Sequence, residues 1–198
     1  MSSESRCRER IGILGGTFDP PHRAHLEMAK VAMSEVPLDW VAFVPARQSP
    51  HKATSGEAGP GDRAEMVRRA IEGCPGFRLV PWELHRPGLS FSVETARQFG
   101  ERFPGAELFW IMGSDQWEVL ETWREWEKLA EMVTFVVFPR PGPIRARDQV
   151  RWRSLDFRLD VASSGLREMI LAGGPWKEWV SQPVADYILA RGLYQHAS

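Results

Sequence analysis

Short apolar runs alternate with helical patterns along most of this chain, and the alternation constrains the fold more than any other feature. Unbroken apolar runs of this length are typical of strands that are buried on both faces of a parallel sheet. The candidate strands, in chain order, are 11–14, 40–44, 77–84, 108–112, 133–138 and 157–161. Because helical segments lie between them, the sequence predicts an α/β fold in which helices cover both faces of a parallel sheet.

Helix starts can be predicted at several of the connections. Asp62, followed three residues later by Glu65, forms a capping-box pattern, and Ser92 is a candidate N-cap for the next helix. Residues 163–191 are helical in pattern with an interruption at Gly-Gly-Pro. Residues 45–61 contain three prolines and three glycines, which predicts a long polar loop, and loops of that length are often functional.

Charge and cysteine content exclude several classes of protein. The formal net charge is −1 and no long basic run occurs, so a nucleic-acid partner is not expected. Cys7 and Cys74 show no metal-binding spacing, which favours a reducing compartment without a disulfide framework. No apolar segment is long enough for a membrane span or a signal peptide, so we expect a cytoplasmic protein without a membrane partner.

Polar and glycine-rich segments follow the candidate strands. In open parallel sheets a ligand binds beyond the carboxyl ends of the strands. The segments that fall there are 15–25, 45–52, 113–115, Arg140 and 163–167. The sequence therefore predicts a binding site at this edge of the sheet.

The first of these segments suggests phosphate chemistry. Gly15-Gly16-Thr17 lies between a strand and a helix, where glycine lets the backbone approach a ligand and the helix N-terminus favours anions. His22 and His25 lie three residues apart at the helix start, and paired imidazoles there can donate hydrogen bonds to phosphate oxygens. A simple turn, a metal-binding pair or two surface histidines would also fit this spacing. The dinucleotide fingerprint GxGxxG is absent.

Two segments at opposite ends of the chain carry a resemblance to a known superfamily. GGTFDPPHRAH at 15–25 resembles the (H/T)xGH signature of the nucleotidylyltransferases, and VASSGLR at 161–167 resembles their second signature, ISSTxxR. The intervening segments FVPARQSPHK (43–52), ELHRPGLSFS (83–92), WIMGSDQWEVLETW (110–123), FVVFPRPG (135–142) and PVADYILARGLY (183–194) resemble those of bacterial nicotinate-nucleotide adenylyltransferases.

The resemblance implies one nucleotidylyltransferase domain over 1–198. Its core, at about 11–160, would be a Rossmann-like doubly wound parallel sheet, followed by a C-terminal helical segment at about 163–194. The implied reaction joins the AMP part of ATP to nicotinate mononucleotide, giving deamido-NAD and pyrophosphate, with Mg²⁺ accompanying ATP. No covalent protein intermediate is implied.

The resemblance also implies a role for each matching residue. The implied catalytic residues are His22, His25 and Arg167. The implied ATP-binding residues are Gly15, Gly16, Thr17, Phe18, Gly113, Asp115, Arg140, Ser163 and Ser164. The implied mononucleotide-binding residues are Lys52, Ser92, Trp123 and Arg124, of which Trp123 would stack on the pyridine ring.

Several of these residues also have a plainer explanation. Asp115, Ser163 and Ser164 have the composition of helix N-caps, Trp123 could only pack, and Arg140 and Lys52 could be solvated loop residues. Arg167 near a helix start is less expected, because cations are disfavoured at the positive end of a helix, and this favours a bound anion.

The match departs from the family pattern at three places. Ala24 replaces the glycine of HxGH, Ala162 replaces the first serine of ISST, and Phe91 stands in a segment that reads SYT in the family. We expect Ala24 to hold the turn slightly further from substrate and Ala162 to remove a hydroxyl from the phosphate site. Two alternatives stay open. Pantetheine-phosphate adenylyltransferases share both signatures, and a non-catalytic nucleotide-binding regulator would fit the two alanines.

Overall fold

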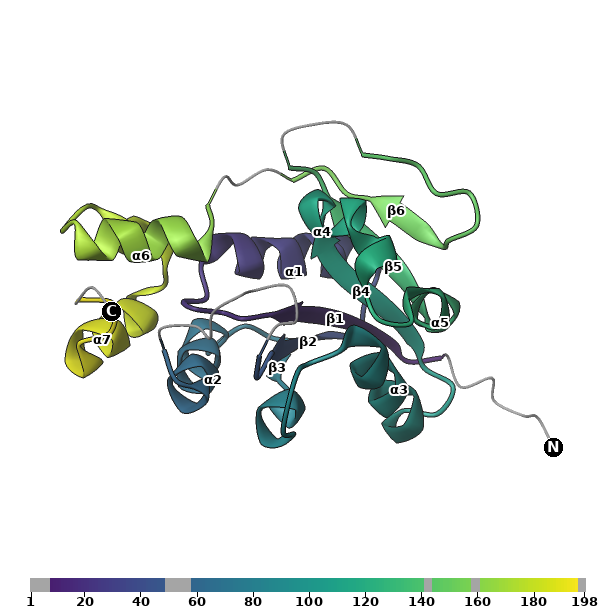
Figure 1. Ribbon diagram of the computed structural model, residues 1–198, viewed down its shortest axis with the longest axis horizontal. Coiled ribbons are helices and arrows are strands. Elements are labelled where there is room, and N and C mark those ends of the chain that lie inside the picture. The colour runs from purple at the N-terminus through teal and green to yellow at the C-terminus, as the bar shows by residue number, and fades with distance from the viewer. Residues whose placement is uncertain (1–7, 49–57, 141–143, 158–160, 196–198) are drawn as a thin grey trace.

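The computed structural model describes residues 8–48, 58–140, 144–157 and 161–195, and within these ranges six strands form one sheet (Figure 1). The strands are β1 (Arg10–Gly16), β2 (Trp40–Pro45), β3 (Phe77–Leu79), β4 (Glu107–Gly113), β5 (Val133–Phe138) and β6 (Trp152–Ser154). Their order is β3-β2-β1-β4-β5-β6, and each neighbouring pair is parallel. The predicted parallel sheet is confirmed.

Helices lie between most of the strands and follow the last of them. They are α1 (Arg23–Glu35), α2 (Pro60–Ala70), α3 (Ser92–Arg102), α4 (Ser114–Glu118), α5 (Trp126–Met132), α6 (Ser163–Leu171) and α7 (Gln182–Arg191). Short 3₁₀ segments lie at η1 (Trp82–His85), η2 (Leu120–Thr122) and η3 (Trp176–Trp179). Among the residues that the structure describes, no helix is long and apolar enough to cross a lipid bilayer.

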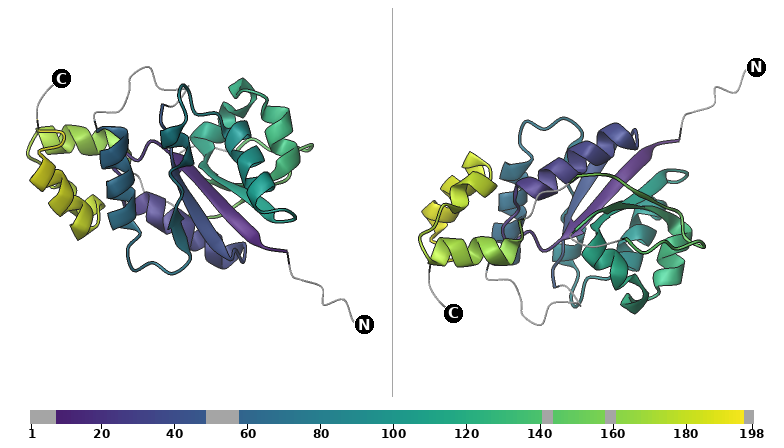
Figure 2. Two further views of the ribbon diagram at one scale, coloured as in Figure 1. Left: turned by 90° about the horizontal axis from the view of Figure 1, so that it is seen from below. Right: turned by 90° about the horizontal axis from the view of Figure 1, so that it is seen from above.

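The sheet is covered on both faces because its side chains alternate between two apolar layers. Ile11 and Ile13 of β1 belong to a layer that also contains Phe99 of α3 and residues of α4 and α5. Leu14 belongs to the opposite layer with Ala29 of α1 and residues of α2, α6 and α7. Figure 2 shows these two groups of helices on opposite sides of the sheet, as expected for the predicted Rossmann-like doubly wound fold.

The strand order reverses at the centre of the sheet. The chain starts in β1, moves outward to β2 and β3, and then returns to pair β4 with the other edge of β1. Leu14 lies opposite Ile111 in this pair, and Gly15 and Gly16 continue beyond it. The connections leave β1 and β4 toward opposite faces, so a crevice opens at their carboxyl ends. A ligand site is expected there.

Two strands differ from their predicted extents. β3 ends at Leu79 instead of continuing to residue 84, because Pro81 cannot donate a ladder hydrogen bond and η1 follows directly. The edge strand lies at 152–154, before the segment where the last strand was predicted. The predicted strand at 157–161 is not formed at Phe157 or Val161, while 158–160 lie outside the described residues. Trp152 anchors β6 by packing on Trp117, with ring centroids 5.2 Å apart.

Two helix starts also differ from the predictions. Gly59 is the N-cap of α2, so Asp62 lies inside the first turn, where its carboxylate accepts a hydrogen bond from the Tyr187 hydroxyl at 2.8 Å. Ser92 is the first residue of α3, and Phe91 occupies the N-cap position. Asp62 bonds Tyr187 instead of capping α2, and Ser92 lines the pocket described in the next subsection.

Candidate active site

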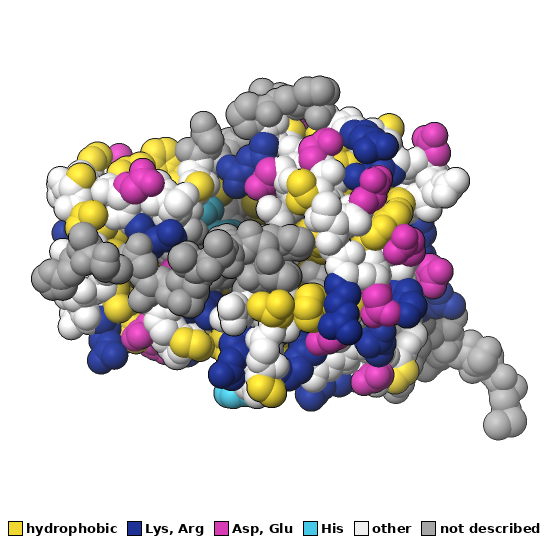
Figure 3. All heavy atoms as spheres, in the orientation of Figure 1, with side chains coloured by type: hydrophobic (Ala, Val, Ile, Leu, Met, Phe, Trp, Pro, Cys, Tyr) yellow, Lys and Arg dark blue, Asp and Glu magenta, His cyan; other side chains and the backbone are white. Residues whose placement is uncertain are grey.

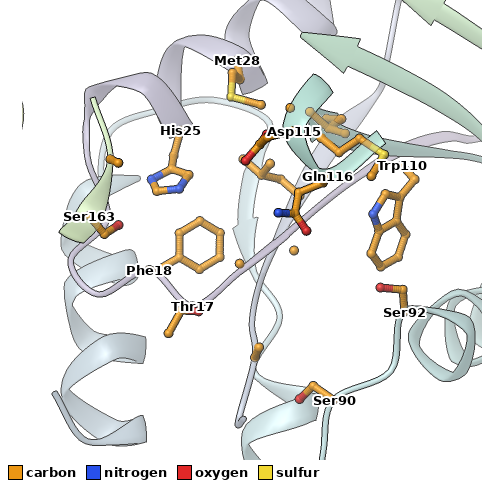
Figure 4. A pocket seen from close by; sticks show the side chains of 18 of the residues that line it. Thr17, Phe18, His25, Met28, Ser90, Ser92, Trp110, Asp115, Gln116 and Ser163 are labelled. Carbon is orange, nitrogen blue, oxygen red and sulfur yellow. The ribbon is translucent and has the colours of Figure 1, made fainter. Parts of the chain in front are cut away.

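A pocket of about 580 Å³ lies at the carboxyl ends of β1 and β4, and we call it the switch-point pocket (Figures 3 and 4). Figure 3 shows histidine side chains inside a hollow near the middle of the molecular face. The predicted site residues that line it are Gly15, Gly16, Thr17, Phe18, His22, His25, Ser92, Gly113, Asp115, Trp123, Arg124, Arg140, Ser163, Ser164 and Arg167. Lys52 lies outside the described residues. The structure thus brings together every other predicted site residue.

The two histidines form a stacked pair at the start of α1. His22 is the N-cap of the helix with an extended backbone, and His25 is the third residue of the helix. Their ring centroids are 3.7 Å apart, and the backbone N–H of His22 donates to Nδ1 of His25 at 3.2 Å. An Nδ1 that accepts places the proton of a neutral imidazole on Nε2, so His25 offers a donor at that atom.

The turn before the histidines owes its shape to Phe18, not to the two glycines. Gly15 and Gly16 belong to β1, which continues through them, whereas Phe18 has a φ of 52°, in the left-handed region. A Cβ on Gly16 would lie 3.3 Å from the Phe18 ring, and one on Gly15 would lie 3.4 Å from the Trp110 ring. Close packing against Phe18 therefore favours glycine at position 16, whereas the contact at position 15 is an ordinary van der Waals distance.

The second signature segment docks onto the first. Ala162 is the N-cap of α6, so neither Ser163 nor Ser164 caps the helix. The Ser163 hydroxyl donates to the carbonyl of Pro20 at 3.0 Å, and Arg167 Nη1 donates to the carbonyl of Asp19 at 2.9 Å. Figure 4 shows Ser163, His25 and Phe18 grouped at one end of the pocket. These two hydrogen bonds join residues that are 143 and 148 positions apart in the sequence, so the two signature segments form one wall of the pocket.

This end of the pocket is suited to anions. The N-terminal ends of α1 and α6 both reach it, and the first backbone N–H groups of a helix have no partner within the helix. Arg167 adds a guanidinium group. Phosphate oxygens are the ligands that such an arrangement binds best.

The opposite end of the pocket is aromatic. Trp123 lines it and also packs edge-on against Trp110, with centroids 6.4 Å apart, so packing and lining are combined in one side chain. The Arg124 guanidinium lies 4.6 Å from the centroid of the Phe91 ring and pairs with Glu94 at 3.7 Å. A flat aromatic ligand with a negative substituent could stack on Trp123 and pair with Arg124 here.

Gly113, Asp115 and Arg140 form the wall between these two ends. Asp115 is the second residue of α4, whose N-cap is Gly113, so capping does not explain the carboxylate. A Cβ on Gly113 would lie 2.4 Å from Asp115 Oδ1, so glycine leaves the room that this carboxylate occupies. The backbone N–H of Arg140 donates to the Ser114 hydroxyl at 2.8 Å, which fixes the start of the loop after β5.

Sequence reasoning missed a buried carboxyl group in the pocket wall. Glu83 is 6% exposed and accepts a short hydrogen bond from the Thr95 hydroxyl. Burial raises the pKa of Glu83, and hydrogen bonds from Thr95 and Ser90 oppose the shift. The segment ELHRPGLSFS contains this residue, but nothing in its pattern indicates that the carboxyl is buried. Other unpredicted lining residues include Met28, Ala46, Gln116 and Trp110.

The two alanine departures have different consequences. Ala24 is 2% exposed and belongs to the apolar layer around α1, so its methyl group points into the core and not toward the pocket. The expected displacement of the turn from substrate therefore has no basis in this geometry. Ala162 lines the pocket, and its position as N-cap leaves α6 without a capping side chain.

Comparison with known proteins first defines a class. A family model described as cytidylyltransferase-like matches residues 13–169, which includes both signature segments and all six strands except the first residues of β1. The chain belongs to this family of nucleotidyltransferases.

Sequence relatives then narrow the class. The chain is 39% identical to a "probable nicotinate-nucleotide adenylyltransferase" of Gloeobacter violaceus, with 94% of this chain and 96% of that protein covered. It is 38% identical to a protein of the same name from Shouchella clausii, with 94% and 97% covered. The chain is therefore a member of the nicotinate-nucleotide adenylyltransferases.

Solved structures show the same fold. The nicotinic acid mononucleotide adenylyltransferase of Plasmodium falciparum complexed with NaAD superposes with a TM-score of 0.80, covering 96% of this chain and 99% of that one at 20% identity. The same enzyme complexed with APC gives a TM-score of 0.77 with the same coverage and identity.

Proposed function

We propose that this protein transfers the adenylyl group of ATP to nicotinate mononucleotide, releasing pyrophosphate and forming deamido-NAD. The observation that carries the proposal is the switch-point pocket itself, which has an anion-binding end at the α1 and α6 N-termini and an aromatic end at Trp123. Two nucleotides laid across the crevice would place their phosphates at the first end and the pyridine ring at the second.

The chemistry needs positioning and charge stabilisation rather than a protein nucleophile. A phosphate oxygen of the mononucleotide attacks the α-phosphorus of ATP, and the bond from that phosphorus to the bridging oxygen breaks as pyrophosphate leaves. In this proposal the Nε2–H of His25 donates to the oxygens on which charge develops, with His22 beside it. Arg167 and the first N–H groups of α6 at Ser163 and Ser164 hold the leaving β- and γ-phosphates.

The other contacts follow the wall of the pocket. Gly15 to Phe18 present backbone to both nucleotides, Gly113 and Asp115 face the adenosine ribose, and Arg140 faces the adenine. Trp123 stacks on the pyridine ring. The first turn of α3 at Ser92, together with Arg124, binds the nicotinate carboxylate.

We propose that Mg²⁺ enters with ATP. Among the residues that the structure describes, no group of three or more histidine, cysteine, aspartate or glutamate side chains could hold a metal ion. The carboxylates that line the pocket are Glu83 and Asp115. This donor set fits an ion held mainly by the phosphate oxygens of ATP, where it neutralises charge on the leaving group.

The test is pyrophosphate release from ATP and Mg²⁺ with nicotinate mononucleotide, nicotinamide mononucleotide or phosphopantetheine as acceptor. The expected result is turnover with a strong preference for nicotinate mononucleotide. A preference for the amide would overturn the substrate, and turnover with phosphopantetheine alone would support the alternative enzyme. Tight binding of deamido-NAD without turnover would indicate a regulator.

A pair of matched variants tests the carboxylate site. Arg124→Leu should raise KM for nicotinate mononucleotide about tenfold or more and change KM for the amide much less, because only the acid carries the charge that Arg124 meets. Arg97→Leu is the control, since Arg97 pairs with Glu125 at 3.9 Å and does not line the pocket. Equal effects of Arg124→Leu on both acceptors would contradict this assignment.

A further inference from the structure

A buried hydrogen-bond hub lies directly behind the phosphate end of the pocket, and the C-terminal segment completes it. The Asp19 carboxylate is 1% exposed, and its Oδ1 accepts the Tyr194 hydroxyl at 2.6 Å and the backbone N–H of Ala58 at 3.2 Å. Tyr194 is itself 6% exposed and lies 175 residues from Asp19 in sequence. Neither residue lines the pocket.

The main chain at Asp19 is held from the opposite side by the second signature segment. Arg167 donates to the Asp19 carbonyl, and Ser163 donates to the carbonyl of the next residue. The side chain of Asp19 is therefore bonded to Tyr194 near the C-terminal end of the described chain. Its main-chain carbonyl is bonded to Arg167, which lines the pocket. A rotation of this residue would move the carbonyl on which Arg167 is positioned, and the turn leads directly into His22.

A buried guanidinium fixes the remaining side of the hub. Arg63 of α2 is 2% exposed and donates to the carbonyls of Thr17 at 2.8 Å, Ala46 at 2.6 Å and Ala58 at 3.2 Å. Thr17 and Ala46 both line the pocket. Burial lowers the pKa of Arg63, and the Asp19 carboxylate nearby opposes that shift. The hub thus joins the loops after β1 and β2 to α6 and to the C-terminal segment.

We infer that Tyr194 is a positioning residue for adenylyl transfer, whose hydroxyl fixes Asp19 and thereby the carbonyl that holds Arg167 and the turn that presents His22. This inference rests on the proposed function. Tyr194 touches neither the pocket nor, in the proposed binding mode, either nucleotide. Its loss should therefore misalign the reacting groups without removing a binding contact, and small misalignments are costly in a preorganised site.

Tyr194→Phe is the test, because it removes one hydroxyl and no packing volume. We expect kcat to fall about tenfold while KM for ATP and for the mononucleotide stays within twofold. Tyr187→Phe is the matched control: its hydroxyl also bonds an aspartate, Asp62, at 2.8 Å, from the same C-terminal segment, but Asp62 lies in α2 and not in the turn whose carbonyl is bonded by Arg167. Its kcat should stay within twofold of wild type. Both variants are assayed well below their measured melting temperatures.

A second variant keeps the inference testable if Tyr194→Phe does not fold. Asp19→Asn retains an acceptor oxygen but weakens it by removing the charge, so kcat should fall severalfold with KM unchanged. The inference is overturned if Tyr194→Phe keeps wild-type kcat, or, when only Asp19→Asn folds, if that variant keeps it. An equal loss of kcat in Tyr187→Phe would also overturn the inference. Failure of the proposed function is seen separately: wild-type enzyme that does not turn over the proposed acceptor overturns both.

Discussion

Nδ1 of His25 accepts the backbone N–H of His22 at 3.2 Å while the two imidazoles stack with centroids 3.7 Å apart. The contact fixes the His25 ring, and in a neutral imidazole it places the proton on Nε2. Phe18 braces the same ring edge-on at a centroid distance of 4.9 Å. The ring is therefore fixed on two sides, as a preorganised donor requires.

Asparagine at position 25 should separate these two roles. Its side-chain oxygen can take the place of Nδ1 as acceptor, but it has no group at the position of Nε2. We expect His25→Asn to fold with a melting temperature near that of wild type and to lose about 10²–10³ in kcat. His85→Asn is the control, because His85 is exposed and lies outside the pocket. Near-normal turnover by His25→Asn would exclude His25 as the donor.

A methyl group at Gly113 should disturb ATP binding. The added Cβ would lie 2.4 Å from Asp115 Oδ1, so this carboxylate must move. Because we propose that Asp115 faces the adenosine ribose, Gly113→Ala should raise KM for ATP severalfold with little change for the mononucleotide. Steady-state kinetics with each substrate varied in turn checks this. An unchanged KM for ATP would show that Asp115 does not contact that nucleotide.

Gly100 provides the opposite case. It lies on the exposed side of α3, and a Cβ there would meet nothing within 4 Å. Alanine restricts the unfolded chain and favours the helix, so Gly100→Ala should stabilise the protein by about 0.5–1 kcal/mol without changing kcat or KM. Urea unfolding monitored by tryptophan fluorescence measures the change. A loss of stability would indicate a steric conflict that the structure does not contain.

The buried Glu83 should make stability fall as pH rises. Because burial raises its pKa in the folded state, the protonated form is favoured, and this contribution is complete below the ordinary value of 4.5 and lost as pH rises through the folded-state pKa. Glu83→Gln keeps an oxygen for the Thr95 hydroxyl but does not titrate. The free energy of unfolding of the variant minus that of wild type should therefore increase with pH above 4.5. A pH-independent difference would contradict the raised pKa.

Glu65 should behave in the opposite way. Hydrogen bonds from Arg68 and Arg69 lower its pKa from 4.5 to about 2, so its contribution is present above pH 4.5 and is lost as pH falls toward 2. Because the pair is largely solvent-screened, Glu65→Gln should cost less than about 1 kcal/mol at pH 7. The difference from wild type should shrink as pH falls below 4.5 and vanish only below about pH 2. Urea unfolding at pH 3 and pH 7 compares the two.

The sheet and the pocket could be predicted from the sequence because each depends on local patterns. Apolar runs such as 133–138 predicted buried strands, and parallel strands place their carboxyl ends at one edge. The signature segments at 15–25 and 161–167 then fell on that edge. The roles assigned to these residues remain predictions, although the structure places all the described ones around a single pocket.

The hub behind the pocket could not be predicted, because each of its bonds joins distant positions. Arg63 is a buried cation held by backbone carbonyls, and carbonyls carry no side-chain pattern in the sequence. The start of its helix was predicted from Asp62 and Glu65, whereas a charged residue in such a helix is ordinarily assigned to the solvent side. Likewise nothing in the pattern around Glu83 indicates that its carboxyl group is buried.

The bond between Asp19 and Tyr194 also sets an order of events during synthesis. A ribosome makes the chain from its N-terminus, so Asp19 emerges 175 residues before the hydroxyl that it accepts. The sheet can assemble as its strands appear, but the turn that carries His22 gains its last side-chain anchor only when the end of α7 has passed. The first residues of the site to be synthesised are thus anchored by one of the last residues that the structure describes.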